Sequence, residues 1–134
     1  MKKISLILVL AIFIASCGQS ERLSNEILVK NFSSMVMKKI VSGQLDEAFL
    51  MIKPKSSLTP AEIDNIASQT KSFREQYAQR YGASIGYELI DVKKAGTCFL
   101  KLRYIEKAER NAYFWTFYFY RTKNSGWVLN AFYW

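Results

Sequence analysis

Apolar positions in the first half of the chain recur at helical spacing. Between Leu23 and about Ser42 they return every three to five residues, which predicts a helix with one buried stripe. Gly43 is suited to the left-handed conformation that ends a helix, and a short second helix should run from about Leu45 until Pro54 prevents its continuation. Two helices are therefore expected at the start of the folded domain.

A third helix is predicted by the clearest local signal in the sequence. Thr59 is a suitable N-cap, Pro60 fits the first helical position, and Glu62 completes a Thr-x-x-Glu capping box. The helix is expected to stop at Gly82. The side chains expected on its buried face are Ile63, Ile66, Ala67, Thr70, Phe73, Tyr77 and Tyr81.

After Gly82 the apolar spacing falls from about 3.6 residues to about 2, which is typical of strands. Four strands are predicted, at about residues 84–94, 97–107, 112–122 and 127–134. Hairpin turns are expected at Ala95-Gly96 and at Asn124-Ser125-Gly126, so the strands should form an antiparallel meander. The expected fold class is α+β, with the N-terminal helices packed on one face of a four-stranded sheet.

Alternation within the second strand places Cys98 on the buried face, together with Leu100, Leu102 and Tyr104. A small core residue is therefore the interpretation of Cys98, with an intermolecular disulfide as the alternative. Lys101 and Arg103 fall on the opposite, outer face.

The third strand is aromatic on both faces. Its inward set, which should belong to the core, is Trp115, Phe117 and Phe119. Tyr118 and Tyr120 would then stand on the outer face, with one parity of Phe132 and Trp134. A strand that is covered on one side only does not need aromatic side chains on the other, so this face is predicted to contact a partner or a second copy.

The first residues resemble an export signal. Ile4 to Ser16 are thirteen uncharged residues behind Lys2 and Lys3, too few to span a bilayer, which needs about 20. The run ends in Ile14-Ala15-Ser16-Cys17, which resembles the bacterial lipobox. That resemblance implies that the Cys17 thiol receives a diacylglycerol anchor and that the chain is cleaved before it. An ordinary signal peptide, or a buried apolar helix with an incidental cysteine, is the alternative.

The predicted organisation is a signal peptide over 1–16, the lipidated cysteine and a tether over 17–22, and one domain over 23–134. The expected location is the cell envelope. Because Gly18 rather than Asp follows Cys17, the resemblance favours the outer membrane, facing the periplasm, if the source has two membranes.

Composition limits the chemistry that the chain can perform. With no His and only two Cys among 134 residues, His-based zinc sites, Ser-His-Asp triads and Cys-His dyads are excluded. No metal site and no cofactor are predicted. The net charge is +8, but the basic residues occur singly or in pairs, so nucleic acid is not an expected partner.

Three segments together resemble the nuclear transport factor two-like superfamily: Ile40 to Phe49, Phe73 to Gly82, and Ser125 to Phe132. The resemblance implies a curved, cone-like sheet that wraps helices around a cavity. Isomerases, dehydratases and polyketide cyclases of this superfamily place an Asp or a His, often with Tyr, inside the cone.

Of the three Asp residues, Asp46 and Asp64 fall in the first turns of helices, where they face water. Asp91 is the weak catalytic candidate, since it shares strand parity with Tyr87 and would lie near Tyr104. Lys93 and Lys94 follow it closely and the strand is ending, which favours a solvent-exposed carboxylate beside a turn.

The prediction for function is a lipid-anchored extracytoplasmic domain that is non-catalytic. It would bind a small apolar ligand in the cone or a protein partner at the envelope, including a second copy. Tyr87, Tyr104, Tyr118 and Tyr120 are the candidate ligand or interface residues. The alternatives are a periplasmic enzyme of the isomerase or dehydratase type that uses Asp91 with Tyr, and an accessory or inhibitory module that binds another envelope protein.

Overall fold

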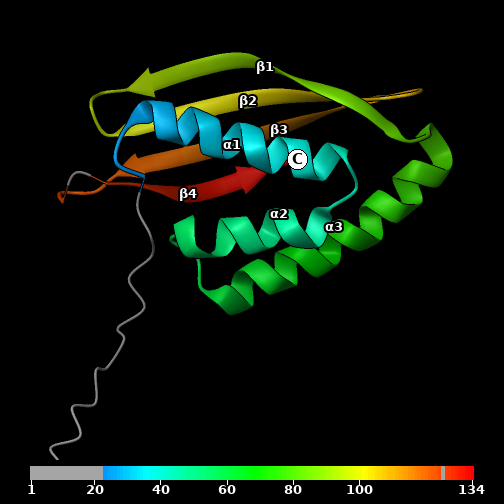
Figure 1. Ribbon diagram of the computed structural model, residues 1–134, viewed down its shortest axis with the longest axis horizontal. Helices are drawn as coiled ribbons and strands as arrows, with labels where there is room; N and C mark the ends of the chain where they lie inside the picture. The colour runs from blue at the N-terminus through cyan, green and yellow to red at the C-terminus, as the bar shows by residue number, and fades with distance from the viewer. Residues whose placement is uncertain (1–22, 125) are drawn as a thin grey trace, which may run out of the picture.

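The computed structural model describes residues 23–124 and 126–134, in which helices are followed by an antiparallel sheet (Figure 1). The predicted signal peptide, Cys17 and the tether lie outside the described residues, so the boundaries of those segments stay predictions. The elements are α1 (Glu26–Val41), α2 (Leu45–Ile52), the short 3-10 helix η1 (Lys53–Lys55), α3 (Pro60–Tyr81), β1 (Ser84–Ala95), β2 (Phe99–Ala108), β3 (Ala112–Arg121) and β4 (Trp127–Tyr133). The α+β class and the order of its elements are confirmed.

The helix ends use the predicted capping residues. At α3 the Glu62 amide donates to Thr59 Oγ1 at 3.3 Å, while the Thr59 amide donates to Glu62 Oε2 at 2.8 Å, which completes the capping box. Gly82 ends the helix at a φ of 85°, in the left-handed region that favours glycine. The N-cap of α1 was not predicted: Asn25 accepts the Leu28 amide at 2.9 Å. No helix in the described part of the chain is both long and apolar enough to cross a membrane.

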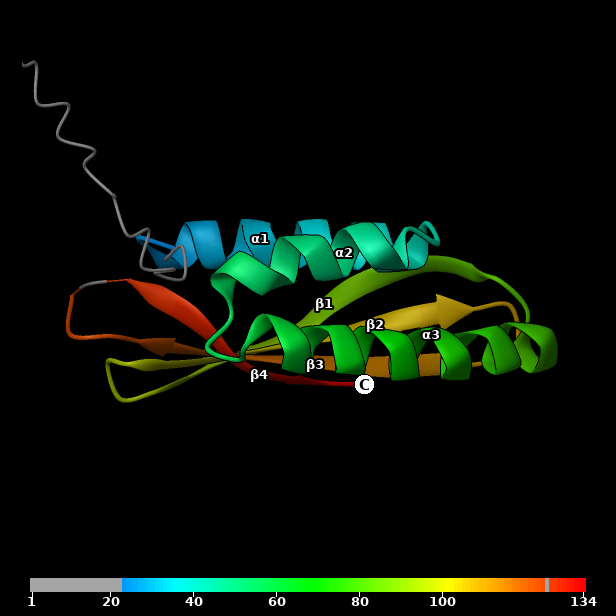
Figure 2. The ribbon, with the colours of Figure 1, turned by 90° about the horizontal axis from the view of Figure 1, so that it is seen from below.

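The four strands pair in the order β1-β2-β3-β4, so the predicted antiparallel meander is also confirmed. Helices α1 and α2 lie together on one face of the sheet, whereas α3 runs along its β4 side (Figure 2). No described helix or strand covers the other face of the sheet, here called the outer face. The described helices therefore cover only one face of the sheet.

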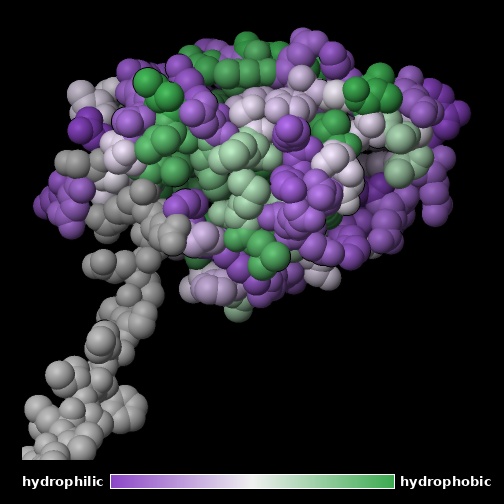
Figure 3. Space-filling model, viewed as in Figure 1, coloured by the Kyte–Doolittle hydropathy of each residue, from purple (hydrophilic) through white to green (hydrophobic). Residues whose placement is uncertain are grey.

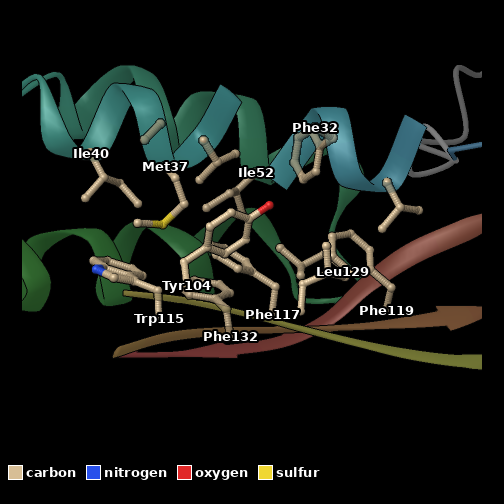
Figure 4. Packing of buried hydrophobic residues seen from close by; sticks show 14 of the residues in the cluster. Phe32, Met37, Ile40, Ile52, Tyr104, Trp115, Phe117, Phe119, Leu129 and Phe132 are labelled. Atoms are coloured by element: carbon tan, nitrogen blue, oxygen red, sulfur yellow. The ribbon is translucent and has the colours of Figure 1, made fainter. Parts of the chain in front are cut away.

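The core fills the space between α1, α2 and the inner face of the sheet (Figure 4). The predicted inward set of β3, Trp115, Phe117 and Phe119, is fully buried. These rings pack against helix side chains such as Phe32, whose ring centroid lies 6.2 Å from that of Phe119. Within the described residues the buried core extends from Leu23 to Phe132 and joins the helices to the sheet, so we expect the stretch 23–134 to fold by itself.

Two predictions about buried side chains are wrong. Helix α3 buries Ile63 and Thr70, but Phe73 and Tyr77 are 52% and 38% exposed, because this helix borders the sheet instead of lying across it. Cys98 is exposed, because β2 begins at Phe99, about two residues after the predicted start, and leaves Cys98 in the turn after β1.

Candidate functional site

A groove of about 790 Å³ lies between α3 and the adjoining parts of β3 and β4. One wall is a single face of α3, since its side chains follow one another at intervals of three or four residues. They are Ile66, Thr70, Phe73, Tyr77 and Tyr81. The other wall comprises Asn111 to Phe114, and Phe132 to Trp134. We call this the aromatic groove.

Ring stacking fixes the base of the aromatic groove. Tyr77 stacks on Tyr113 with ring centroids 5.8 Å apart and meets Trp134 edge to face at 5.9 Å. Trp134 stacks in turn on the buried Trp115 at 5.4 Å, and its indole N–H donates to Thr70 Oγ1 at 3.2 Å. The groove is thus an open surface with a rigid floor that is continuous with the core.

Other exposed apolar side chains do not form a site of this kind. On the side covered by α1 and α2, hydrophobic patches alternate with hydrophilic ones (Figure 3). Ile27, Met35 and Leu50 are exposed on these two helices. Apolar residues scattered singly in this way are normal on soluble domains, and they do not mark a binding surface.

A buried carboxylate that the sequence reading missed lies close to the groove. Glu106 has no exposed surface, and Arg74 Nη1 and Nη2 lie 2.8 and 2.6 Å from its two carboxylate oxygens. The Trp115 indole N–H donates to the same group at 2.7 Å, and the Ser84 hydroxyl also binds it. The alternation of β2 could have indicated its burial, since Glu106 lies on the same face of the strand as the buried Leu100.

This arrangement keeps Glu106 ionised. Burial raises the pKa of Glu106, but the hydrogen bonds and positive charge of Arg74, with the donors Ser84 and Trp115, hold that pKa below its ordinary value. The Arg74 guanidinium also lies 5.9 and 5.8 Å from the ring centroids of Trp115 and Trp134. Glu106 is therefore a structural anion that joins β2 to α3, and it is not free to accept a proton from a ligand.

Tyr87 and Tyr104 lie together on the inner face, with ring centroids 6.0 Å apart. Both hydroxyls bind α1: Tyr104 Oη lies 2.8 Å from Ser33 Oγ, and Tyr87 donates to the Ser34 carbonyl oxygen at 3.0 Å. Burial raises the pKa of Tyr104, although its hydrogen bond with Ser33 acts in the opposite direction. Tyr104 is therefore part of the filled core, and Tyr87 packs against it.

Asp91 does not share the face of Tyr87, which corrects the expected parity. The pairing of β1 with β2 shifts between Leu89 and Asp91, where Ile90 is an extra residue. Beyond this irregularity Asp91 pairs with Arg103 of the outer face, and its carboxylate lies 3.7 Å from Lys93 Nζ. The structure therefore separates Asp91 from both candidate tyrosines.

The outer face carries Tyr118 and Tyr120 as predicted, together with Lys101 and Arg103. Tyr120 is 42% exposed, and Lys101 Nζ lies 5.7 Å from the Tyr118 ring centroid. The β4 residue on this face is Tyr133, whose side chain is exposed at 63%, and not Phe132 or Trp134.

Phe132 and Trp134, which were expected to supply a side chain to the outer face, pack on the inner side. Phe132 is buried against Phe117, and Trp134 stacks on Trp115. Their alternation with Tyr133 follows from the pairing of Phe132 with the inward Phe117. No group of three or more His, Cys, Asp or Glu side chains that could hold a metal ion occurs within residues 23–124 and 126–134.

Comparison with known proteins adds information on the fold. No model of a protein family matches the sequence, and no curated protein sequence matches it. Among solved structures, the chain is similar to a Campylobacter jejuni protein provisionally named as an NTF2-like transpeptidase. The TM-score is 0.50 and the identity 16%, over 79% of this chain and 96% of that one. This likeness supports an NTF2-like fold for the domain.

Proposed function

We propose that this protein is a lipid-anchored, extracytoplasmic, non-catalytic domain that binds an apolar ligand in the aromatic groove. The observation that carries the proposal is the contrast between two regions of the domain. The interior of the cone is filled by Trp115, Phe117 and Phe119, whereas the groove beside α3 is open. Concave, largely apolar surfaces with a few polar groups are the usual form of ligand sites in proteins.

The placement of the carboxylates favours binding over catalysis. Asp91 lies on the outer face, away from Tyr87 and Tyr104, and Glu106 is held as an ion by Arg74. The described lining of the groove contains no Ser, Cys, Lys, Asp or Glu. Acyl transfer by a transpeptidase requires a nucleophile activated by a base, and the Thr and Tyr hydroxyls of the described lining have no His, Lys, Asp or Glu among them, so the name of the structural neighbour does not carry over to this groove.

The proposed anchor would present the groove away from the membrane. Leu23 pairs with Trp127 at the start of β4, with backbone hydrogen bonds of 2.9 and 2.7 Å. The groove lies at the other end of β4, beside Trp134. Because β4 has seven residues, about 23 Å of strand separates the two ends. A short tether from Cys17 to Leu23 would therefore leave the groove open to the aqueous side.

Binding of an anilinonaphthalene sulfonate dye to the domain 23–134 tests the proposal. We expect saturable fluorescence that Phe73→Ser weakens by about tenfold, because burying a phenylalanine side chain contributes about 1.5 to 3 kcal/mol. Leu50→Ser is the matched control, since Leu50 is also exposed but lies on α2, outside the groove. Equal effects of the two substitutions, or no saturable binding, would contradict the proposal.

A protein contact through the outer face is the second candidate function. It is favoured by the exposed aromatic side chains of Phe114, Tyr120 and Tyr133 on a face that no described element covers. Arg103 lies 5.6 Å from the Phe114 ring centroid, so the face is basic as well as aromatic. Aromatic residues and Arg are enriched at protein interfaces.

A further inference from the structure

The aromatic groove contains part of a strand edge that has no partner among the described residues. β3 pairs with β2 from Ala112 onward, but its pairing with β4 begins only at Thr116, opposite Tyr133. The stretch Ala112–Phe114 therefore has a neighbouring strand on one side only, whereas Trp115 is fully buried and stacks on Trp134. Beyond the end of β4, β3 continues beside α3 (Figure 1 and Figure 2). An unpaired strand edge offers backbone N–H and C=O groups to an added extended chain.

Helix α3 forms the wall that faces this edge. Phe73, Tyr77 and Tyr81 line the groove from the helix, whereas Tyr113 and Phe114 line it from β3. A slot between a helix and a strand edge is suited to an extended peptide, since the edge pairs with its backbone and the helix contacts alternate side chains. A compact apolar molecule would use the aromatic rings but would leave the backbone groups of the edge unpaired.

The direction of β4 defines the direction of a peptide that continues its line. β4 runs antiparallel to β3, so an added strand with the same direction would proceed from Trp134 toward Ala112. Three residues of β3 are available, which corresponds to about 10 Å of extended chain. The carboxyl end of such a peptide would therefore reach the end of the groove formed by Tyr81 and Asn111.

Exposed positive charge marks this same end. The Arg80 guanidinium lies 5.0 Å from the Tyr81 ring centroid, and the Arg110 amide donates to the Tyr81 carbonyl oxygen at 3.0 Å. Both side chains are exposed, and neither arginine forms an ion pair within the described part of the chain, although Glu109 lies close by against Gly82. Two arginines against one carboxylate leave a positive end, which complements a terminal carboxylate.

We propose that the aromatic groove binds the carboxyl-terminal segment of a partner polypeptide as an added strand. The segment pairs with β3 over Ala112–Phe114, packs apolar side chains against α3, and places its terminal carboxylate near Arg80 and Arg110. This inference rests on the proposed binding role of the groove, and it adds the class of ligand and its direction.

The test uses the full chain in lipid nanodiscs, with empty nanodiscs as the blank. The probes are three fluorescein-labelled hexapeptides in which threonine alternates with valine, leucine or phenylalanine, the apolar residue standing at the carboxyl end. Each is prepared with a free carboxylate, with a carboxamide, and with every backbone nitrogen methylated. Fluorescence anisotropy measures affinity, and hydrogen exchange measures protection of the amides of Ala112 and Phe114, which alternate with amides bonded to β2.

We expect at least one free-carboxylate peptide to bind and to slow exchange at Ala112 and Phe114 by about tenfold or more. Methylation should abolish binding, because it removes the backbone donors, and the carboxamide should weaken binding by about tenfold. In the double variant Arg80→Gln, Arg110→Gln the free acid and the amide should bind equally. Arg121→Gln, an exposed arginine at the far end of β3, is the control and should preserve their difference.

The dye measurement separates this inference from the proposed function. If the dye binds as expected but all three peptides fail, or if methylated peptides bind as well as unmodified ones, strand addition is wrong and the apolar site stands. Displacement of the dye by palmitate but not by peptide would identify an acyl-chain site and would also overturn the inference. Failure of dye and peptides together would remove both proposals.

Discussion

Glu106 shows how one residue joins several elements of this domain. Its carboxylate is fully buried and binds Arg74, Ser84 and Trp115, so α3, β1, β2 and β3 meet at a single anion. Removing one member of a buried ion pair leaves the other charge uncompensated, at a cost of about 3 to 5 kcal/mol. Glu106→Gln should therefore lower the free energy of unfolding at pH 7 by about 3 kcal/mol, which urea denaturation of the domain 23–134 can measure.

The effect of Glu106→Gln should depend on pH in a defined direction. The pKa of Glu106 is lowered by folding, so its stabilising contribution is present above the unfolded pKa, near 4.5, and is lost as pH falls through the folded value. The difference between wild type and Glu106→Gln should shrink when unfolding is repeated at about pH 3. Glu88→Gln, which removes an exposed ion pair with Lys107, is the control and should change little. A difference that is unchanged by pH would contradict an ionised Glu106.

Asp91 and Cys98 show where residue-level reasoning failed. Strict alternation placed both on the inner face, but an extra residue at Ile90 reverses the parity of β1, and a start of β2 about two residues later than predicted leaves Cys98 exposed in a turn. A bulge depends on the pairing of two strands, so one strand read alone does not contain that information. Glu106 was missed for a different reason. It lies on the buried face of β2, but a charged side chain was not expected in the core.

Whole elements were predictable because several local signals agreed. The capping box of Thr59 and Glu62, the stop at Gly82 and the change of period after it all matched the boundaries of the third helix and the following strand. The position of α3 was not predictable, since amphipathic spacing identifies an apolar face but does not say whether a sheet covers it. Phe73 and Tyr77 were therefore assigned to the core, whereas they line the groove.

The N-cap of α3 provides a prediction at the scale of the element. Thr59→Ala removes the acceptor of the Glu62 amide and leaves a helix donor unsatisfied, so the free energy of unfolding should fall by about 0.5 to 2 kcal/mol. Ser68→Ala, at an exposed position in the middle of the same helix, is the control and should be neutral or slightly stabilising. Urea unfolding measures both variants. An unchanged midpoint and slope for Thr59→Ala would mean that the cap contributes no stability.

For the whole molecule, attachment to the membrane depends on Cys17 in the proposed function. Cys17→Ser offers no thiolate for diacylglyceryl transfer, so metabolic labelling with a radioactive fatty acid should mark the wild-type chain and fail to mark the variant. Cys98→Ser is the control, since it also replaces one thiol. It should retain the label, because Cys98 lies in the turn after β1 and outside the predicted lipobox. Label that persists in Cys17→Ser would refute the anchor at this position.

The uncovered outer face leads to the last prediction, which concerns assembly. Tyr118 and Tyr120 stand on this face beside Tyr133, and a carboxylate forced into a desolvated interface lacks the partners that would offset its lost hydration. If the face joins two copies or a partner, Tyr118→Glu, Tyr120→Glu should weaken that assembly by about a hundredfold or more, as measured by sedimentation. Asp91 lies on the same face, but Asp91→Asn removes a charge instead of adding one. It should therefore leave assembly and complementation of a deletion strain intact. If the double substitution changes neither assay while Asp91→Asn abolishes complementation in a folded protein, the interface is wrong and a catalytic role for Asp91 takes its place.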